Sequence, residues 1–426
     1  MATVTGRWLV GTRYREIIGA DDPPGAEPKG DFIVAGPGND YLIADIGADV
    51  FGFEPGHGLD FINHFTPGED KIQFGGGLTA ESLTIRPETI AGVAGLAIYY
   101  AGVGGPDSVF LAGVSALQPG DIVFEPLPGK FFDPPVQDFN IDFKSDVVLR
   151  RADGSVAEWQ MNGTRIGAEK ILANPGNDWK VIGSGDFNGN WKPDLLFQHK
   201  DGPPVIWNMD GFTIQKSLEL PNPGPQWSAV GIGHFDDDPG ADILFQHDDG
   251  TIVIWFMGSW QLPDGAIREA KVIAEPGPDW KVVGTGDFNG DYKADILFRH
   301  EDGRVVAWQM DGSRIAAHAE IGTLAEGASV VGTGDFDNNN RDEILVQQAD
   351  GSLAMWSMNG VTVTGVTDIA NPGPGRKVVD TGDYDGNGKT DILLQHTDGS
   401  VEVWLMDGAR VASSGIAAAK SDWIVT

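Results

Sequence analysis

The chain has 426 residues, of which 41% are hydrophobic and 9% aromatic, enough apolar side chains for more than one folded domain. Its 62 acidic residues against 29 basic ones give a formal net charge of −33, which argues against a nucleic-acid partner because phosphate binding needs a cationic face. The chain has no cysteine for disulfides or thiol chemistry, and no apolar run reaches the roughly 18 residues that predict a membrane span.

Aspartates recur at short intervals near the start of the chain, each followed by an apolar run. Asp31, Asp40, Asp49 and Asp60 are 9, 9 and 11 residues apart. This pattern resembles the glycine-rich nonapeptide of the hemolysin-type (RTX) calcium-binding repeat. The resemblance implies a parallel β-roll in which two nonapeptides make one turn. Asp31 would then stack on Asp49, and Asp40 on Asp60, with Ca²⁺ between the turns.

The next segment resembles the end of such a roll. Residues 48–56 and 60–72 are similar to the terminal part of hemolysin-type domains, including those attached to serralysin-like proteases. No His-Glu-x-x-His motif is present, so a protease activity is not implied. The strands expected to cap the roll are Leu83–Arg86, Ala97–Tyr100, Ser108–Leu111 and Asp121–Phe124. We therefore predict a β-roll domain over residues 1–125, followed by a proline-rich linker over residues 126–137.

Nine-residue loops with alternating oxygen-bearing side chains recur along the rest of the chain. In the clearest copy, Asp287, Asn289, Asp291 and Asp295 occupy the first, third, fifth and ninth positions. Such a loop can surround a Ca²⁺ ion with oxygen ligands, but the closing acid and the strand after it differ from an EF-hand. The other predicted ligands are Asp138, Asn140, Asp142 and Asp146; Asp186, Asn188, Asn190 and Asp194; Asp236, Asp238 and Asp242, after His234 at the first position; Asp335, Asp337, Asn339 and Glu343; and Asp383, Asp385, Asn387 and Asp391.

The loops keep a regular period. They start at residues 138, 186, 234, 287, 335 and 383, so the steps are 48, 48, 53, 48 and 48. Each unit also carries a Trp-x-Met strand flanked by turn dipeptides, and reads as four strands, for example 296–299, 305–309, 314–321 and 329–333. Four strands per unit of this length predict a six-bladed β-propeller, with a seven-bladed ring as the alternative. Residues 422–425 resemble 178–182 and are expected to close the ring against the first unit.

Residues 138–426 resemble the FG-GAP/VCBS repeat family, which includes the propellers of integrin α-subunits. The six loops in phase carry this resemblance, which implies blades stabilised by Ca²⁺. The predicted fold is therefore all-β, a parallel β-roll joined to a six-bladed propeller.

Two further series keep the same period and are candidates for ligand binding. Tryptophans follow polar or proline-glycine turns at Trp179, Trp227, Trp280 and Trp423. Histidines end a strand before a hairpin turn at His199, His247, His300 and His396. An exposed indole can stack on a sugar ring, but packing is the favoured explanation for the tryptophans, as hydrogen bonds within the turns are for the histidines.

These observations favour a monomeric, calcium-binding protein of the extracellular space or cell surface, with a lectin-like or adhesive propeller and a glycan or cell-surface partner. The N-terminus lacks a Sec-type signal pattern, so type I secretion is the expected export route. One alternative is an alkylating enzyme of the cylindrocyclophane type, which the chain resembles in joining a roll to a propeller. Its residues to test would be Arg13, Tyr14, Arg15, Tyr99 and Tyr100. Another alternative is a structural cell-surface spacer.

Overall fold

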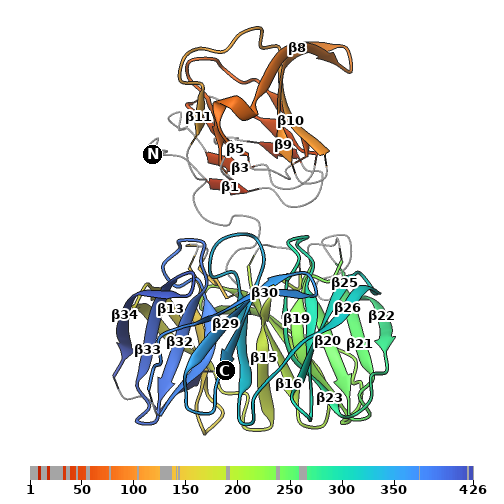
Figure 1. Ribbon diagram of the computed structural model, residues 1–426, viewed down its shortest axis with the longest axis vertical. Coiled ribbons are helices and arrows are strands. Elements are labelled where there is room, and N and C mark those ends of the chain that lie inside the picture. Colours follow the sequence, from red (N-terminus) through yellow and green to blue (C-terminus); the bar gives the residue numbers. More distant parts are fainter. Residues whose placement is uncertain are drawn as a thin grey trace. The chain divides into compact units, whose positions relative to one another are not determined.

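The computed structural model divides the chain into two compact units, residues 1–134 and 135–426 (Figure 1). It describes residues 8–10, 17–19, 32–34, 39–44, 47–53, 58–75, 78–102, 105–124, 137–140, 142, 144–188, 192–236, 240–258, 266–373, 375–419 and 422–425. Their regular structure is almost entirely strand, apart from one short 3-10 helix, η1 (Ala80–Ser82). No helix within these ranges is long and apolar enough to cross a membrane. Of the predicted linker, 126–137, only residue 137 lies within them.

In the first unit the chain alternates between two sheets. One sheet is parallel throughout and has the order β1 (Trp8–Val10), β3 (Phe32–Val34), β5 (Val50–Phe53), β7 (Lys71–Phe74) and β11 (Ile122–Phe124). The other joins β2 (Ile17–Gly19), β4 (Tyr41–Ile43), β6 (Leu59–Asn63) and β10 (Gly105–Ala112) in parallel, then β9 (Val93–Gly102) and β8 (Thr84–Ile90) as antiparallel neighbours. All four strands expected after residue 80 are present, as β8 to β11.

The second unit consists of six four-stranded antiparallel sheets, which we number as blades. Blade one is β35 (Ile424–Val425), β12 (Val147–Arg150), β13 (Val156–Asn162) and β14 (Arg165–Ala173). Blade two is β15 (Trp179–Gly185), β16 (Asp194–His199), β17 (Pro204–Asp210) and β18 (Thr213–Glu219). Blade three is β19 (Trp227–Gly233), β20 (Asp242–His247), β21 (Ile252–Met257) and β22 (Ile267–Ala274). Blade four is β23 (Trp280–Gly286), β24 (Asp295–His300), β25 (Arg304–Asp311) and β26 (Arg314–Thr323). Blade five is β27 (Ser329–Gly334), β28 (Glu343–Gln347), β29 (Leu353–Asn359) and β30 (Thr362–Asp368). Blade six is β31 (Arg376–Gly382), β32 (Asp391–His396), β33 (Val401–Asp407) and β34 (Arg410–Ala418).

This architecture confirms the six-bladed propeller and excludes the seven-bladed alternative. One expectation about the units is wrong. The strand at 329–333 was expected to end the unit that begins at 296, but β27 pairs with β28 and so opens the next blade. The predicted calcium loop joins these two strands. Gly334 at the end of β27 pairs with Glu343 at the start of β28, so the two strands run antiparallel on either side of the loop.

The Trp-x-Met strands pack between blades. Each of the six tryptophan–methionine pairs lies in a different apolar cluster, and every cluster contains residues of two neighbouring blades. The aromatic residue at the second position of each loop joins these clusters and is almost fully buried, as in Phe288 and Tyr384. The Trp-x-Met pairs therefore pack neighbouring blades against one another.

The C-terminal strand closes the ring. Val425 pairs with Leu149 of β12, so the innermost strand of blade one comes from the end of the chain. On the loop side, the Ser145 N–H donates to the Asp383 carbonyl at 2.6 Å. Gly382 permits this approach, because a Cβ at that position would lie 2.6 Å from the Ser145 side chain.

Removing residues 422–426 should therefore open the propeller. β12 would become an unpaired edge, and sheet edges promote association with other chains. We expect a lower urea midpoint and aggregates in size-exclusion chromatography. Removing Thr426 alone is the matched control and should change neither. A truncated protein that remains monomeric with an unchanged midpoint would contradict the role of this strand.

Candidate functional sites

The closing acid of each predicted calcium loop is buried and ties the loop to the blade. In blade six, Asp391 accepts the backbone N–H of Tyr384 at 3.0 Å and that of Met406 at 2.7 Å. Asp146, Asp194, Asp242 and Asp295 accept the corresponding pairs of N–H groups in their own blades. One carboxylate thus fixes both the start of the loop and the Trp-x-Met strand.

The acid at the first position shapes the loop itself. Asp383 accepts the N–H groups of Gly386, Asn387 and Gly388 at 2.7 to 3.1 Å. Its equivalent Asp287 accepts from residues 289 to 292 in the same way. The loop is therefore wound around this carboxylate, and the side chains at positions three and five are held near it.

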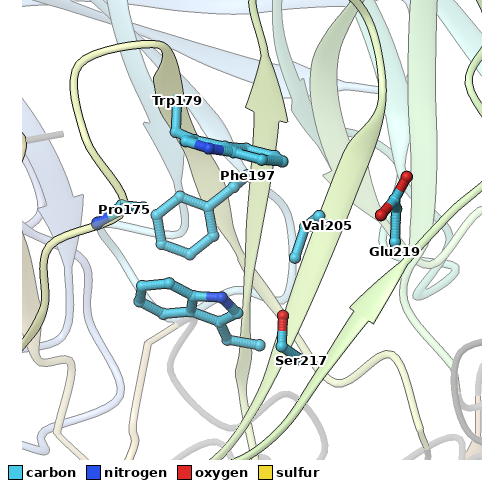
Figure 2. A pocket seen from close by; sticks show the side chains of 7 residues that line it. Pro175, Trp179, Phe197, Val205, Ser217 and Glu219 are labelled. Carbon is cyan, nitrogen blue, oxygen red and sulfur yellow. The ribbon is translucent and has the colours of Figure 1, made fainter.

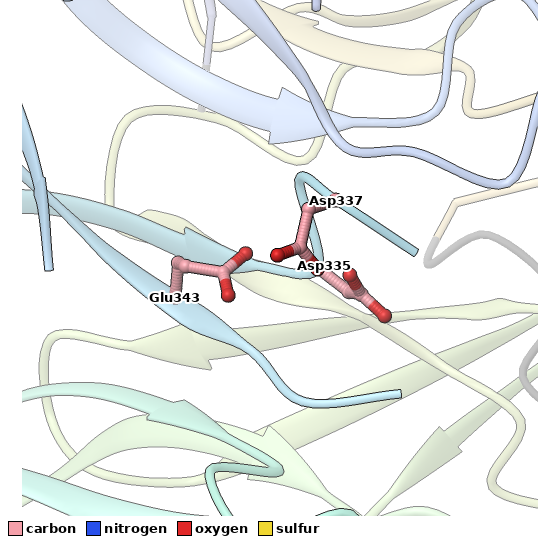
Figure 3. Close-up of side chains that lie close together, drawn as sticks. All are labelled: Asp335, Asp337 and Glu343. Carbon is pink, nitrogen blue, oxygen red and sulfur yellow. The ribbon is translucent and has the colours of Figure 1, made fainter. Parts of the chain in front are cut away.

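Two loops bring three acids together. The carboxylate oxygens of Asp335, Asp337 and Glu343 lie within 4.8 Å of one another, as do those of Asp383, Asp385 and Asp391. Figure 3 shows the first group, with its carboxyl groups converging. In each group one buried oxygen, Glu343 Oε1 or Asp385 Oδ1, has no hydrogen-bond partner. Converging carboxylates with unsatisfied buried oxygens fit a bound divalent cation, and hard oxygen donors are the ligands that Ca²⁺ prefers.

The other loops differ from these two. In the loop that begins at His234, Arg268 donates to Asp236, so a guanidinium lies against the carboxylate there. Asp238 and Asn190 are outside the described residues. In the first loop, Asp142 accepts from the Lys144 ammonium at 3.4 Å.

Burial changes the titration of the closing acids. It raises the pKa of Asp146, Asp295, Asp391 and Glu343 to about 8, although the backbone N–H groups that they accept act in the opposite direction. Burial likewise raises the pKa of Asp287 and Asp383 to about 6. A cation close to these groups would favour their ionised form.

In the first unit, aspartates at neighbouring strands are linked by hydrogen bonds from a backbone N–H to a carboxylate, and we call these rows aspartate ladders. Asp60 accepts the Asp40 N–H at 2.9 Å, so these two residues lie next to each other. Asp49 donates its N–H to Asp70 at 3.0 Å, whereas its predicted partner Asp31 lies outside the described residues. Burial raises the pKa of Asp60 to about 9, and its buried Oδ2 atom has no hydrogen-bond partner.

Sequence reasoning missed three members of these ladders. Asp70 belongs to one sheet, Asp121 accepts the Gly68 and Gln118 N–H groups in that same sheet, and Asp107 accepts the Gly58 N–H in the other. The common signal was available for Asp70 and Asp121, because each immediately precedes or starts an apolar strand, as Asp40, Asp49 and Asp60 do.

The tryptophan and histidine series prove to be cross-strand partners. Trp179 pairs with His199, Trp227 with His247, and Trp280 with His300, and the ring centroids are 4.7 to 4.8 Å apart. Trp423 instead lies under the Arg151 guanidinium at 4.0 Å. At His199, His247 and His300, Nδ1 accepts a backbone N–H within the following turn at 3.2 to 3.3 Å.

In blade six the same position holds a charged group. His396 pairs with Arg376, which replaces the tryptophan, and both contact Glu402. The Glu402 carboxylate lies 2.9 Å from His396 Nε2 and also accepts the Trp404 indole N–H at 2.9 Å.

Glutamines beside the histidines connect neighbouring blades, a role that the sequence did not suggest. Gln198 donates to the Trp227 carbonyl at 2.7 Å and accepts the Ala229 N–H at 2.8 Å. Gln246 makes the same contacts to Trp280 and Val282, and Gln395 donates to the Trp423 carbonyl. These bonds hold the first strand of the next blade at the end of the ring opposite the loops.

A pocket of about 360 Å³ lies over one face of blade two. It is lined by Pro175, Trp179, Phe197, Val205, Trp207, Ser217 and Glu219, and we call it the blade-two slot. Figure 2 shows Pro175 and the aromatic rings on one side, and Ser217 and Glu219 on the other. An aromatic wall beside a hydroxyl and a carboxylate offers both a stacking surface and hydrogen-bond acceptors.

The residues at the positions of Ser217 and Glu219 differ in the other blades. Strand register places Ser217 opposite Trp207 and Glu219 opposite Val205. In blade three the equivalent positions are Ala270 and Val272. In blade four they are His318 and Glu320. Trp179, Trp227 and Trp280 therefore share a ring contact but not a binding surface.

Of the residues linked to the alkylating alternative, the structure describes Tyr99 and Tyr100. Arg13, Tyr14 and Arg15 lie outside the described residues. The Tyr99 hydroxyl donates to Glu88 at 2.8 Å and accepts from Arg86 at 3.1 Å. Tyr100 is buried against Phe53 and Phe74 in the core of its unit.

Residues 287–346 and 335–394 match the FG-GAP-like repeat family. The chain carries FG-GAP-like repeats. No curated protein matches the sequence.

Solved structures with similarity to the chain include the C-terminal WD40 domain of Sif2, at 17% identity, 76% coverage of this chain, 78% of that chain and a TM-score of 0.31. BBS1N in complex with ARL6DN shares 14% identity, with coverages of 66% and 81% and a TM-score of 0.36. BamB from Moraxella catarrhalis shares 14% identity, with coverages of 65% and 82% and a TM-score of 0.34.

Asp391→Asn tests the structural role of a closing acid. The amide can accept only one of the two N–H groups and would turn its own NH₂ toward the other. An unsatisfied buried donor costs about 1–3 kcal/mol, so the free energy of unfolding in urea should fall by this amount. Asp398→Asn, in an exposed turn where Asp398 accepts the Ser400 N–H, is the control and should cost less than about 1 kcal/mol. Equal stability of the two variants would refute the role.

Proposed function

We propose that the protein is a calcium-stabilised binding protein of lectin-like or adhesive type, whose ligand is a glycan held in the blade-two slot. The slot is the observation that carries this proposal. It combines Trp179 and Trp207 with the Ser217 hydroxyl and the Glu219 carboxylate. A sugar ring presents C–H groups on its faces and hydroxyl groups around its edge, so it matches an aromatic wall beside polar acceptors.

Bound calcium would stabilise the folded propeller rather than take part in ligand binding. The groups around Glu343 and Asp391 are the best candidates, because their carboxylates converge and include buried oxygens without a partner. The loop wound around Asp287 has the same side-chain pattern. Bound between buried acids on strand ends, Ca²⁺ would offset the repulsion of the carboxylates and hold each blade together.

The first unit would be a hemolysin-type β-roll. Parallel strands that alternate between two sheets and the Asp40–Asp60 contact support this assignment. The buried Asp60 Oδ2 atom, which has no hydrogen-bond partner, fits a cation between the turns. With the roll would come type I secretion to the cell surface or the medium, and we propose that the secreted protein acts as a monomer.

Calcium should change how stability depends on pH. The closing acids have a pKa of about 8 in the folded chain against the ordinary 3.8 to 4.5, so the folded state binds more protons between these values. Without Ca²⁺, the free energy of unfolding should therefore fall as pH rises from about 4 to about 8. Calcium at 100 times its dissociation constant should add about 2.7 kcal/mol per site. A fixed Ca²⁺ concentration should stabilise the fold more at pH 8 than at pH 5, because the ligands must be ionised to bind.

The measurement is urea unfolding at pH 5, 6.5 and 8, in EDTA and in millimolar Ca²⁺, with Mg²⁺ as the control for ionic strength. Curves that coincide in EDTA and in Ca²⁺ at every pH would reject the calcium part of the proposal.

Trp179→Ala and Trp227→Ala separate binding from packing. Both remove an indole that contacts a histidine, so both should destabilise the fold to a similar degree. Only Trp179 lines the slot, so a glycan array should show at least tenfold weaker binding for its variant and little change for the other. Loss of binding in both variants would move the site elsewhere, and no glycan binding by the intact chain would favour a structural spacer.

A further inference from the structure

We infer that the blade-two slot selects a glycan carrying a cationic nitrogen, namely the free amine of an amino sugar. This inference rests on the proposed function and adds the charge of the ligand. It comes from comparing blade two with blade four, where a side chain of the protein occupies the corresponding position.

Blade four repeats the aromatic and acidic wall of the slot. Strand register places Trp280, Trp308 and Glu320 where blade two has Trp179, Trp207 and Glu219. Beside Trp280 and Glu320 lies the guanidinium of Arg304, whose nearest acid is Asp302 at 2.9 Å. Its central carbon is 5.4 Å from the Trp280 ring centre, and Nη1 is 3.9 Å from the Glu320 carboxylate. This cation therefore faces an aromatic ring and a carboxylate of the wall, besides its turn partner Asp302.

Blade two has the same wall without the built-in cation. Pro203 stands at the register position of Arg304, one residue before the strand segment that pairs with β16. Within the described part of the chain, no Lys or Arg forms an ion pair with Glu219. The slot is therefore lined by two tryptophans and an acid whose counterpart in blade four contacts a cation.

The volume of the slot favours a ring-bearing ligand over a bare ammonium group. About 360 Å³ falls within the range of small-molecule pockets, and Pro175, Phe197 and Ser217 add lining that a single cation would not cover. A hexosamine would place its C–H face on the indole, its hydroxyl groups near Ser217 and its ammonium group near Glu219. The formal charge of −33 also favours the approach of a cationic polymer.

The test compares two oligosaccharides that differ mainly in charge, a glucosamine trimer and an N-acetylglucosamine trimer, by calorimetry on the full chain near pH 6. We expect the amine to bind at least tenfold more tightly, with one site per chain and a clear weakening in high salt. Glu219→Gln should abolish the preference, whereas Glu320→Gln, the matched change in blade four, should leave it intact.

Arg304→Ala provides the converse test, because it removes the internal cation beside Trp280 and Glu320. The number of sites for the glucosamine trimer should rise from one to two. Thermal unfolding of each variant checks that the fold persists. Equal affinity for the two trimers would overturn the inference and leave glycan binding in place. Binding of neither trimer, with other glycans binding, would also overturn it, and no glycan binding of any kind would remove the proposed function as well. A single site in the Arg304→Ala variant would refute the equivalence of the two walls.

Discussion

The propeller depends on a buried carboxylate that accepts two backbone N–H groups from different parts of one blade. At Asp391 these come from Tyr384 in the loop and Met406 in the third strand. The position needs an acceptor with two oxygens for the two N–H groups. Burying the negative charge of such a carboxylate costs free energy unless the charge is paired or hydrogen-bonded. A cation bound by the loop would resolve this conflict, because it would stabilise the ionised form that both N–H groups require.

The same arrangement separates stability from recognition. The first strands of blades two, three and four run from a tryptophan to the loop, as β15 does from Trp179 to Gly185, so these tryptophans and the loops lie at opposite ends of the blades. The loops are linked around one end by backbone bonds such as Ser145 to Asp383, and the glutamines link the other end. With the ring fixed at both ends, residues over the outer strands can change from blade to blade at little cost to the fold.

The sequence was informative wherever the repeat itself was the signal. Loops, Trp-x-Met strands and turns recur in phase, and this was enough to predict six blades and the closing strand. It was less informative where a residue acts across strands. His199 follows Trp179 by 20 residues, as His247 follows Trp227, but this spacing alone does not identify the two residues as cross-strand partners. The sequence also did not show where one blade ends and the next begins. Residues 329–334 follow blade four in the sequence, but they are hydrogen-bonded to blade five.

The slot was beyond prediction for a further reason. A register shift between Asn208 and Met209 decides which residues of β18 lie opposite Trp207 and Val205, and bulges of this kind leave no sequence period. The shift recurs in the other blades, so the same two positions can be compared around the ring. That comparison shows one scaffold with different contents: His318 and Glu320 in blade four, Ser414 and Ile416 in blade six, and Ala270 and Val272 in blade three. A ring of near-identical repeats needs only its shared contacts to fold. A single blade can therefore have the acid, Glu219, without a cation at the position of Arg304. In this way a repeated scaffold can carry a site that is not repeated.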